Sequence, residues 1–436
     1  MDRATPEPGV TLAELLAAFS LTTDLGLGQP MEHLLRSWRL ADRLGERMDL
    51  AADERSSLYY VAVLSWVGCV ADTPEVARWF GDDIAFRESA YGVDFAGLPA
   101  LGLVLGRAGL GHPVPTRIGI AARLMATGAR SVKQGIASHC LTTSRMAERL
   151  GLGAGVSDSV QQFFTRWDGK GVPDGIGGED IAAGVRLFHL ADVVDVFHRS
   201  HGLDAAVEVA RSRRGTQFDP RVVDTFCASA PEVLRDGEDA PDWYDAVSAD
   251  PALRRRLTGP ELDETLEAFA DYTDLRSACR AGHSRRVAEL AATAGSLAGL
   301  PAADVEVLRR AGLLHDIGLH GVPATILDKP GPLTATEAER MRMHAYYTDR
   351  VLSRPAALAR IGAVAPRSSR RTRPRRRAAA PAPARPDRTG TGGSRSRPAA
   401  PVPDRRPRRP GRAPAVATAR GRCSTRASAC ARPRWR

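Results

Sequence analysis

The sequence predicts an all-α protein, and three observations lead to that fold class. Apolar residues recur at three- and four-residue spacing in segments 34–44, 58–67, 287–297 and 305–314, as on one face of a helix. Helix-start signals precede helical patterns, such as Thr11 before residues 12–19 and Pro301 before the pattern that ends at Leu314. Long alternation of apolar and polar residues is scarce. A helical bundle is therefore the expected architecture.

The positive charge of the chain is confined to its C-terminal end. The 436 residues include 61 Lys and Arg against 51 Asp and Glu, a formal net charge of +10. Residues 366–436 hold 22 Arg and 2 Asp, which leaves 39 basic and 49 acidic residues in 1–365. The body is thus an acidic globular protein, and the basic net charge does not indicate what the body binds.

Residues 366–436 differ in composition from the rest of the chain. They contain 12 Pro and no Leu, Ile, Met, Phe or Tyr, so they cannot bury enough apolar surface and are predicted to be disordered. An Arg-rich arm of this kind binds nucleic acid through phosphate contacts. Alternatively, a frameshift near Ala365 in GC-rich DNA explains the segment, because the whole chain has only three Lys against 58 Arg. We favour the frameshift, so nucleic-acid binding by the tail is not expected.

Several classes of protein are excluded by composition. The longest apolar segment, 58–71, has 14 residues, fewer than the roughly 18–20 that a membrane span needs. Residues 1–9 are polar and contain Pro and acids, unlike a signal peptide. The six cysteines have no CxxC spacing, which argues against a disulfide framework and a thiolate zinc site. We expect a cytoplasmic protein without a membrane partner.

An internal repeat relates the two halves of the body. Five residues reappear as the same residue type 250 positions later: His33, Leu50, Leu58, Leu64 and Gly68. A further match, of His139 with His344, has an offset of 205. Five matches at one offset favour duplication over chance, and the change of offset places about 45 extra residues in the first copy, roughly within 70–132.

The strongest chemical signal is the adjacent pair His315-Asp316 at the end of an apolar helix in the second copy. Divalent metals bind such a mixture of nitrogen and oxygen ligands, and a carboxylate can bridge two ions. A bound metal would lower the pKa of water and so supply hydroxide near neutral pH. Taken in isolation, the pair also fits a buried histidine whose hydrogen bonds are satisfied by the neighbouring aspartate.

The context of the pair resembles the HD-GYP subgroup of the HD phosphohydrolase superfamily. The matching pattern extends over most of the second copy and comprises His283, the run 315–318, the segments 321–323 and 326–331, and His344. The resemblance implies an all-α fold with a two- or three-metal centre that hydrolyses cyclic di-GMP or a related cyclic dinucleotide. The implied metal is iron or manganese, with magnesium as an alternative. The implied ligands are His283, His315, Asp316 and His344, with His315 and Asp316 at the catalytic position and Asp316 bridging.

The second copy departs from the family pattern. Leu319 stands where the family usually has a lysine that meets substrate phosphate. The family's His-His-Glu triplet, its Gly-Tyr-Pro loop and its Ala-Asp helix do not follow, because the chain enters the Arg/Pro segment at 366. We therefore expect an incomplete second domain and impaired activity.

The first copy resembles the same family but has lost its metal chemistry. Residues 166–173 look like the signature loop, 186–195 like the ligand helix and 215–220 like the C-terminal motif. Ser65-Trp66 occupies the position of His315-Asp316, and Phe163-Phe164-Thr165 occupies that of His-His-Glu. Tryptophan and phenylalanine cannot bind a metal, so this copy is predicted to be degenerate.

Two groups of residues in the first copy keep some functional character. His33, His139 and Asp192 survive at ligand positions, but a packed and hydrogen-bonded core is favoured for them over a metal site. Arg166, Asp168 and Lys170 lie in a Gly-rich turn that suits a phosphate. A plain turn between helices explains these three residues equally well.

The predicted organisation follows from these motifs. It consists of an N-terminal segment (1–20), a degenerate HD-GYP-like domain (21–230), a helical linker (231–275), the N-terminal part of a second HD-GYP domain (276–365) and a disordered tail (366–436). The predicted function is metal-dependent hydrolysis of a cyclic dinucleotide. The alternative is a non-catalytic signalling or transcriptional regulator whose C-terminal helix-turn-helix is lost. A homodimer is also possible in either case.

Overall fold

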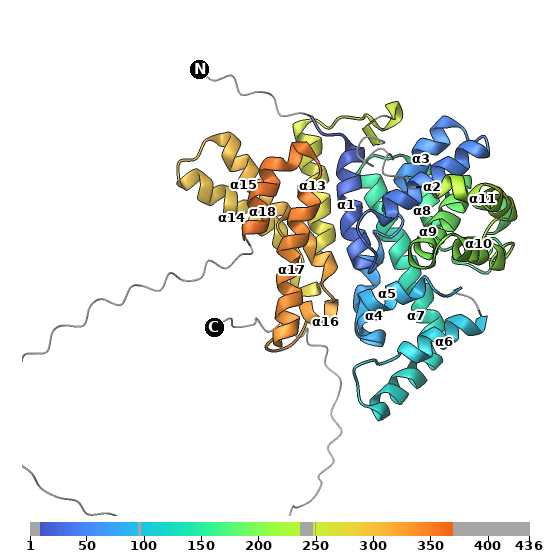
Figure 1. The fold of residues 1–436 in the computed structure, drawn as a ribbon. Coiled ribbons are helices and arrows are strands. Elements are labelled where there is room, and N and C mark those ends of the chain that lie inside the picture. Colours follow the sequence, from blue (N-terminus) through green and yellow to red (C-terminus); the bar gives the residue numbers. More distant parts are fainter. Residues whose placement is uncertain (1–8, 95–96, 236–246, 249, 369–436) are drawn as a thin grey trace, which may run out of the picture. The chain divides into compact units, whose positions relative to one another are not determined.

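The computed structural model describes residues 9–94, 97–235, 247–248 and 250–368. The predicted all-α class is confirmed, since the described residues form helices and only two isolated β-bridges (Figure 1). The Arg/Pro tail from residue 369 onward, including its predicted disorder, lies outside the described residues. Within the described ranges, no helix combines the length and apolar character required to cross a bilayer.

The helices fall into two series along the chain. The first series is α1 (Leu12–Gly26), α2 (His33–Arg47), α3 (Ala52–Leu64), α4 (Cys69–Phe80), α5 (Asp83–Ala90), α6 (Gly97–Arg107), α7 (Val114–Arg149), α8 (Ala154–Gln161), α9 (Ala183–His201), α10 (Leu203–Ser212) and α11 (Pro220–Val233). The second series is α13 (Gly259–Asp274), α14 (His283–Leu297), α15 (Ala302–Leu314), the 3₁₀ turn η4 (Ile317–Gly321), α16 (Ala324–Leu327), α17 (Ala335–Leu352) and α18 (Ala359–Ser368). A capping box starts α1, where Thr11 Oγ1 accepts from the Glu14 amide at 3.1 Å and the Glu14 carboxylate accepts from the Thr11 amide at 2.8 Å.

The internal repeat is visible in the helix boundaries. Helices α14 and α15 have the bounds of α2 and α3 shifted by 250 positions. A buried aspartate precedes each pair: Asp24 accepts hydrogen bonds from the amides of His33 and Leu34, and Asp274 accepts from the amide and hydroxyl of Ser284. Because these bonds satisfy amides at the first turn of each helix, they fix the start of α2 and α14 in the same way.

The second offset, 205, also has a structural counterpart. The amide of Gly68 donates to Thr143 Oγ1 at 3.0 Å, and the amide of Gly318 donates to Thr348 Oγ1 at 3.1 Å. A Cβ at either glycine would overlap the carbonyl oxygen of the histidine on the facing helix. Glycine is therefore required where α7 crosses the end of α3 and where α17 crosses the end of α15. The start of α18 is the start of α8 shifted by the same offset, and α18 likewise packs on the preceding helices of its repeat.

The two series of helices share contacts through α1 and α13. The ring of Phe19 in α1 stacks on that of Phe269 in α13 with centroids 4.2 Å apart, and the two helices lie side by side (Figure 1). Helices α4 and α5, in the extra segment of the first repeat, contribute a buried ionic contact. The Asp83 carboxylate lies 2.9 Å from Arg87 and 3.2 Å from the fully buried Arg276, and it also accepts from the Ala324 amide at 2.8 Å.

Candidate functional site

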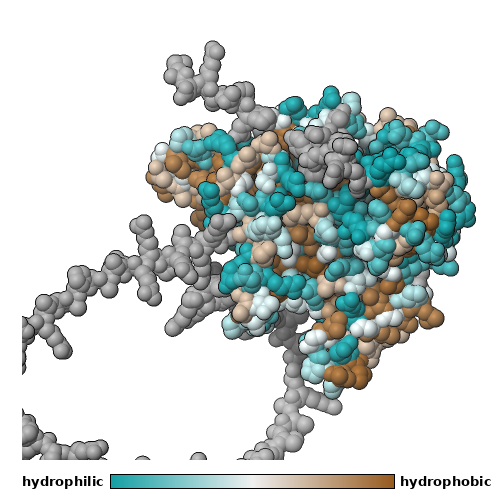
Figure 2. Space-filling model, viewed as in Figure 1, coloured by the Kyte–Doolittle hydropathy of each residue, from teal (hydrophilic) through white to brown (hydrophobic). Residues whose placement is uncertain are grey.

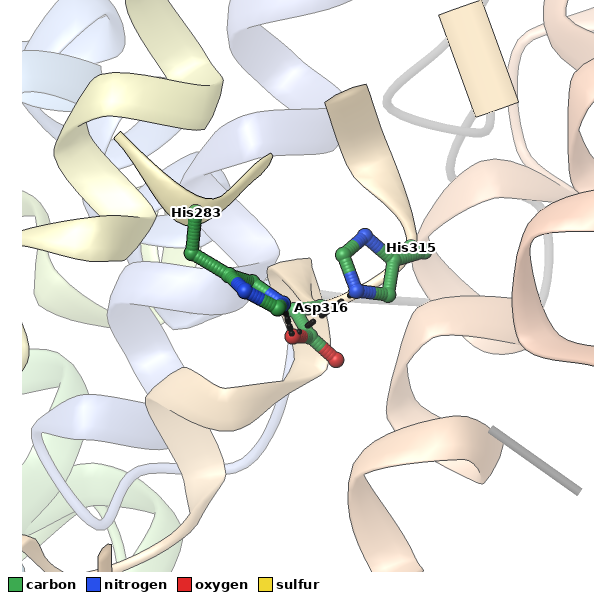
Figure 3. Close-up of side chains that lie close together, drawn as sticks. All are labelled: His283, His315 and Asp316. Atoms are coloured by element: carbon green, nitrogen blue, oxygen red, sulfur yellow. Dashed lines mark ion pairs between the residues drawn. The ribbon is translucent and has the colours of Figure 1, made fainter. Parts of the chain in front are cut away.

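The end of α15 places the pair His315-Asp316 beside the start of α14. Helix α15 ends at Leu314, with His315 as its C-cap, and Asp316 is the N-cap of the 3₁₀ turn η4. The two side chains therefore lie next to each other at the junction between the helix and the turn. The turn is held against α17 by the close approach at Gly318. His283, the first residue of α14, lies across from the pair. Figure 3 shows both imidazoles directed at the Asp316 carboxylate.

Three histidine nitrogens surround the Asp316 carboxylate. The Nε2 atoms of His315 and His283 lie 3.0 and 3.4 Å from Asp316 Oδ2, and the Nε2 atom of His344 lies 3.7 Å from Oδ1. One ligand atom from each of His283, His315 and Asp316 lies within 4.8 Å of the others. The structure thus brings together the four residues that the sequence predicts as metal ligands, with His344 at slightly longer range.

Backbone hydrogen bonds orient two of these imidazoles. His315 Nδ1 donates to the Gly312 carbonyl at 2.8 Å, and His344 Nδ1 donates to the Met341 carbonyl. In both rings the Nε2 atom is therefore the unprotonated nitrogen when the ring is neutral, and it faces the carboxylate. A second hydrogen bond of this type is typical of histidines that ligate a metal.

The electrostatic surroundings keep these histidines neutral. Burial lowers the pKa of His315 to about 4, and the nearby positive charge of Arg280 adds to the effect. Burial, Arg280 and Arg286 lower the pKa of His283 to about 4, and burial lowers the pKa of His344. Neutral imidazoles are the form that binds a metal. The donor set of imidazole nitrogens and one carboxylate fits iron, manganese or a similar divalent ion.

One residue of this site is not identified by the sequence motif. The guanidinium of Arg280, on the 3₁₀ turn before α14, is paired with the Asp316 carboxylate. The guanidinium pairs with Oδ2, the carboxylate oxygen that the Nε2 atoms of His283 and His315 also face. Position 280 corresponds to Pro30 in the first copy, so the repeat offers no signal for it.

The corresponding position in the first copy is filled by side chains. The indole of Trp66 packs against Phe163 and Phe164, with ring centroids 4.8 and 5.7 Å apart. Its Nε1 donates to Asp192 Oδ2 at 3.1 Å, while His33 Nε2 donates to the other oxygen of the same carboxylate at 2.9 Å. Both oxygens of Asp192 are thus engaged by protein donors.

His33 is held between two carboxylates. Its Nδ1 donates to Asp195 Oδ2 at 2.7 Å, and the hydroxyl of Tyr91 lies 3.3 Å from its Nε2. Burial alone would lower the pKa of His33, but the hydrogen bonds to Asp192 and Asp195 raise it to about 9. A protonated imidazole therefore carries the positive charge in this copy. Asp195 and Tyr91 were not singled out from the sequence, because only the fold brings them to His33.

His139 points away from this network. Its Nε2 donates to the Ser65 carbonyl at 2.7 Å, and burial lowers its pKa, so the ring is neutral. Its counterpart His344 instead directs Nε2 at Asp316. Among the residues that the structure describes, the group that could hold a metal is the one at His283, His315 and Asp316.

The Gly-rich turn of the first copy is occupied by internal ion pairs. Arg166 Nε lies 3.1 Å from Asp168 Oδ1, and the same guanidinium is paired with Asp94. The Lys170 side chain is exposed, with its ammonium 3.9 Å from Asp168. Of the three residues predicted for phosphate, only Lys170 presents its charge to solvent.

Comparison with known proteins gives matches to most of the chain. A family model for the HD domain matches residues 280–376. The 3′3′-cGAMP-specific phosphodiesterase 3 of Vibrio cholerae is 29% identical over 348 residues, which are 78% of this chain and 75% of that protein. The cyclic di-GMP phosphodiesterase of Thermotoga maritima is 36% identical over 94 residues, 22% of this chain and 25% of that protein. A crystal structure of a cyclic GMP-AMP-specific phosphodiesterase of V. cholerae matches with a TM-score of 0.59 and 28% identity, over 80% of each chain.

Proposed function

We propose that this chain hydrolyses a phosphodiester bond of a cyclic dinucleotide with a metal centre in its second repeat. The chain contains an HD domain and is a homologue of the HD-GYP-type cyclic dinucleotide phosphodiesterases. The observation that carries this proposal is the convergence of His283, His315 and His344 on the Asp316 carboxylate. The relatives named above act on 3′3′-cGAMP or cyclic di-GMP, so we propose one of these as the substrate.

The four residues would hold the ion as follows. His283, His315 and His344 would each supply Nε2, and Asp316 would supply a carboxylate oxygen to one or two ions. Iron or manganese is the proposed metal, with magnesium as the alternative. When bound, such a metal supplies a hydroxide nucleophile near neutral pH and stabilises the charge that develops on the phosphoryl oxygens. The carbonyls of Gly312 and Met341 orient two of the imidazoles for this task.

The chain's own residues also suggest weak turnover. Leu319, at the family's lysine position, is 2% exposed and packs with Val322 and Ile326 in a small apolar cluster. It therefore offers no charge to a substrate phosphate. The sequence after Ala365 contains no His-His-Glu triplet and no Ala-Asp pair, so the second repeat lacks a counterpart of Asp192. We therefore propose an impaired phosphodiesterase rather than an efficient one.

The alternative function, a non-catalytic regulator, is favoured by the first repeat. In this repeat Trp66 fills the position of the metal site, and both oxygens of the Asp192 carboxylate accept hydrogen bonds from protein donors. We therefore propose that this repeat binds no metal. The lost helix-turn-helix of this alternative falls in the tail, outside the described residues. Phosphate binding by Arg166, Asp168 and Lys170 stays a prediction, and the pairing of Arg166 with Asp94 and Asp168 weighs against a role for Arg166.

Hydrolysis by the purified full chain tests the proposal. The chain would be incubated with Mn²⁺ or Fe²⁺ and either 3′3′-cGAMP or cyclic di-GMP, and linear products separated by chromatography. We expect slow turnover that falls roughly 100-fold or more in Asp316→Asn. Glu339→Gln, an exposed carboxylate change on α17, is the matched control and should leave the rate unchanged. Metal binding without turnover of either substrate would favour the regulator.

Two further expectations are proposals of the same kind. Exposed apolar side chains on α6 and α7, including Leu98, Val114 and Ile118, offer a face for the proposed homodimer, which sedimentation of the full chain would test. We propose the cytoplasm as the compartment, since Cys69, Cys140 and Cys227 are free thiols. Cell fractionation would test this location.

A further inference from the structure

The first repeat covers one face of α2 with helix α9. Four residues of α2 at heptad-like spacing, His33, Ser37, Leu40 and Leu44, are between 0% and 4% exposed. Helix α9 packs along α2 and presents Asp192 and Asp195 to His33. This face of α2 thus binds a helix that is apolar on one side and carries two aspartates one turn apart.

The second repeat leaves the equivalent face open. The stripe of α14 consists of the counterparts at the offset of 250, His283, Val287, Leu290 and Ala294, together with Leu297 one turn further on, whose counterpart Arg47 is exposed. Leu290, the counterpart of the buried Leu40, is 70% exposed, and Leu297 is 85% exposed. Figure 2 shows hydrophobic surface over the α14–α15 hairpin at the left edge of the view. Continued at the offset of 205, the counterpart of α9 falls at 388–406, a segment with three Pro and no Leu, Ile, Met or Phe, so its sequence lacks the apolar side of an α9-type helix.

The charges beside the stripe also match the first repeat. Arg36 of α2 lies 3.3 Å from Asp195 of α9. Its counterpart at the offset of 250, Arg286, is exposed, and no carboxylate is within ion-pair distance among the described residues. Leu290 and Leu297 supply the apolar contact, and Arg286 and His283 supply donors at one end. A helix with aspartates at that end complements both.

We propose that the stripe of α14 is a docking site for an amphipathic helix of the α9 type, supplied by another polypeptide. The helix would lay its apolar side on Leu290 and Leu297 and direct two aspartates, one turn apart, at His283 and Arg286. Binding of this helix does not depend on turnover, so failure of the activity test would leave the docking site to be judged by its own experiment.

A labelled peptide with the sequence of residues 183–201 is the probe, and fluorescence anisotropy with the full chain is the assay. We expect saturable binding with a Kd on the order of 10 μM, typical of a helix on an open apolar face. Leu290→Glu should weaken binding at least about tenfold, because it places a charge in the centre of the contact. The matched control is Leu110→Glu, at a residue of the turn between α6 and α7 that is 41% exposed, and it should leave binding unchanged. A peptide with Asp192→Asn and Asp195→Asn should bind about tenfold more weakly.

Three results would overturn the proposal. The first is an absence of saturable binding up to about 1 mM peptide. The second is equal binding by the native chain and Leu290→Glu. The third is a dimer of the full chain that Leu290→Glu dissociates and that does not bind the peptide, because the stripe of α14 would then be a self-association surface.

Discussion

Replacement of His33 by glutamine tests whether a proton has taken the place of a metal in the first repeat. The imidazole is fully buried and donates to Asp192 and Asp195 at 2.9 and 2.7 Å. Its pKa rises from 6.5 to about 9 on folding. At about 1.36 kcal/mol per pKa unit, this shift corresponds to about 3 kcal/mol of stability at low pH. Loss of one partner of a buried ion pair costs a similar amount.

The pH dependence distinguishes this ion pair from simple packing. Because the folded chain holds the His33 proton more tightly than the unfolded chain, the full contribution is present below pH 6.5. It is lost as the pH rises from 6.5 through about 9. The free energy of unfolding would be measured by urea denaturation of the native chain and His33→Gln between pH 6 and 10. The difference between the two should fall by about 3 kcal/mol over this range. A difference that stays constant or grows with pH would refute the reasoning.

Three further predictions concern the second repeat and its contact with the first. Gly318→Ala should reduce both the stability of the fold and its metal binding, because the new Cβ would overlap the His344 carbonyl and displace α17. Gly259→Ala, at an open position, should change neither, and equal metal content in the two variants would contradict the prediction. Arg280→Ala should tighten Mn²⁺ binding roughly tenfold in calorimetry, because it removes a cation that is paired with Asp316. Unchanged or weaker Mn²⁺ binding would be evidence against competition between Arg280 and the metal for this carboxylate. Asp83→Asn should lower the free energy of unfolding by about 3–5 kcal/mol in urea, since the buried Arg276 would lose its carboxylate while Arg87 keeps only Asp72. A loss below about 1 kcal/mol would exclude a structural role for the Asp83–Arg276 pair.

Much of the fold could be predicted because the two repeats share local signals. The offset of 250 predicts the boundaries of α14 and α15 from those of α2 and α3, and helical periodicity predicts the all-α class. The resemblance based on His283 and His315-Asp316 is confirmed by the HD-domain match and the V. cholerae relative. These features depend on the order of residues along the chain, which the sequence contains directly.

The parts that were missed depend on contacts between distant segments. Arg280 has no counterpart in the first copy, and its pairing with Asp316 depends on the path of the turn before α14. Tyr91 lies in the extra segment of the first repeat and reaches His33 only after α5 has packed. No periodicity or spacing rule assigns a side chain to a partner at such separations, because the assignment follows from tertiary packing.

The metal content of the full chain and two variants tests the central claim most directly. The chain would be loaded with Mn²⁺, separated from free metal and analysed by plasma mass spectrometry alongside Asp316→Asn and Asp192→Asn, with circular dichroism to confirm that each is folded. Our account predicts that the native chain and Asp192→Asn retain metal while Asp316→Asn loses it. Retention by Asp316→Asn together with loss in Asp192→Asn would place the metal in the first repeat and contradict the account.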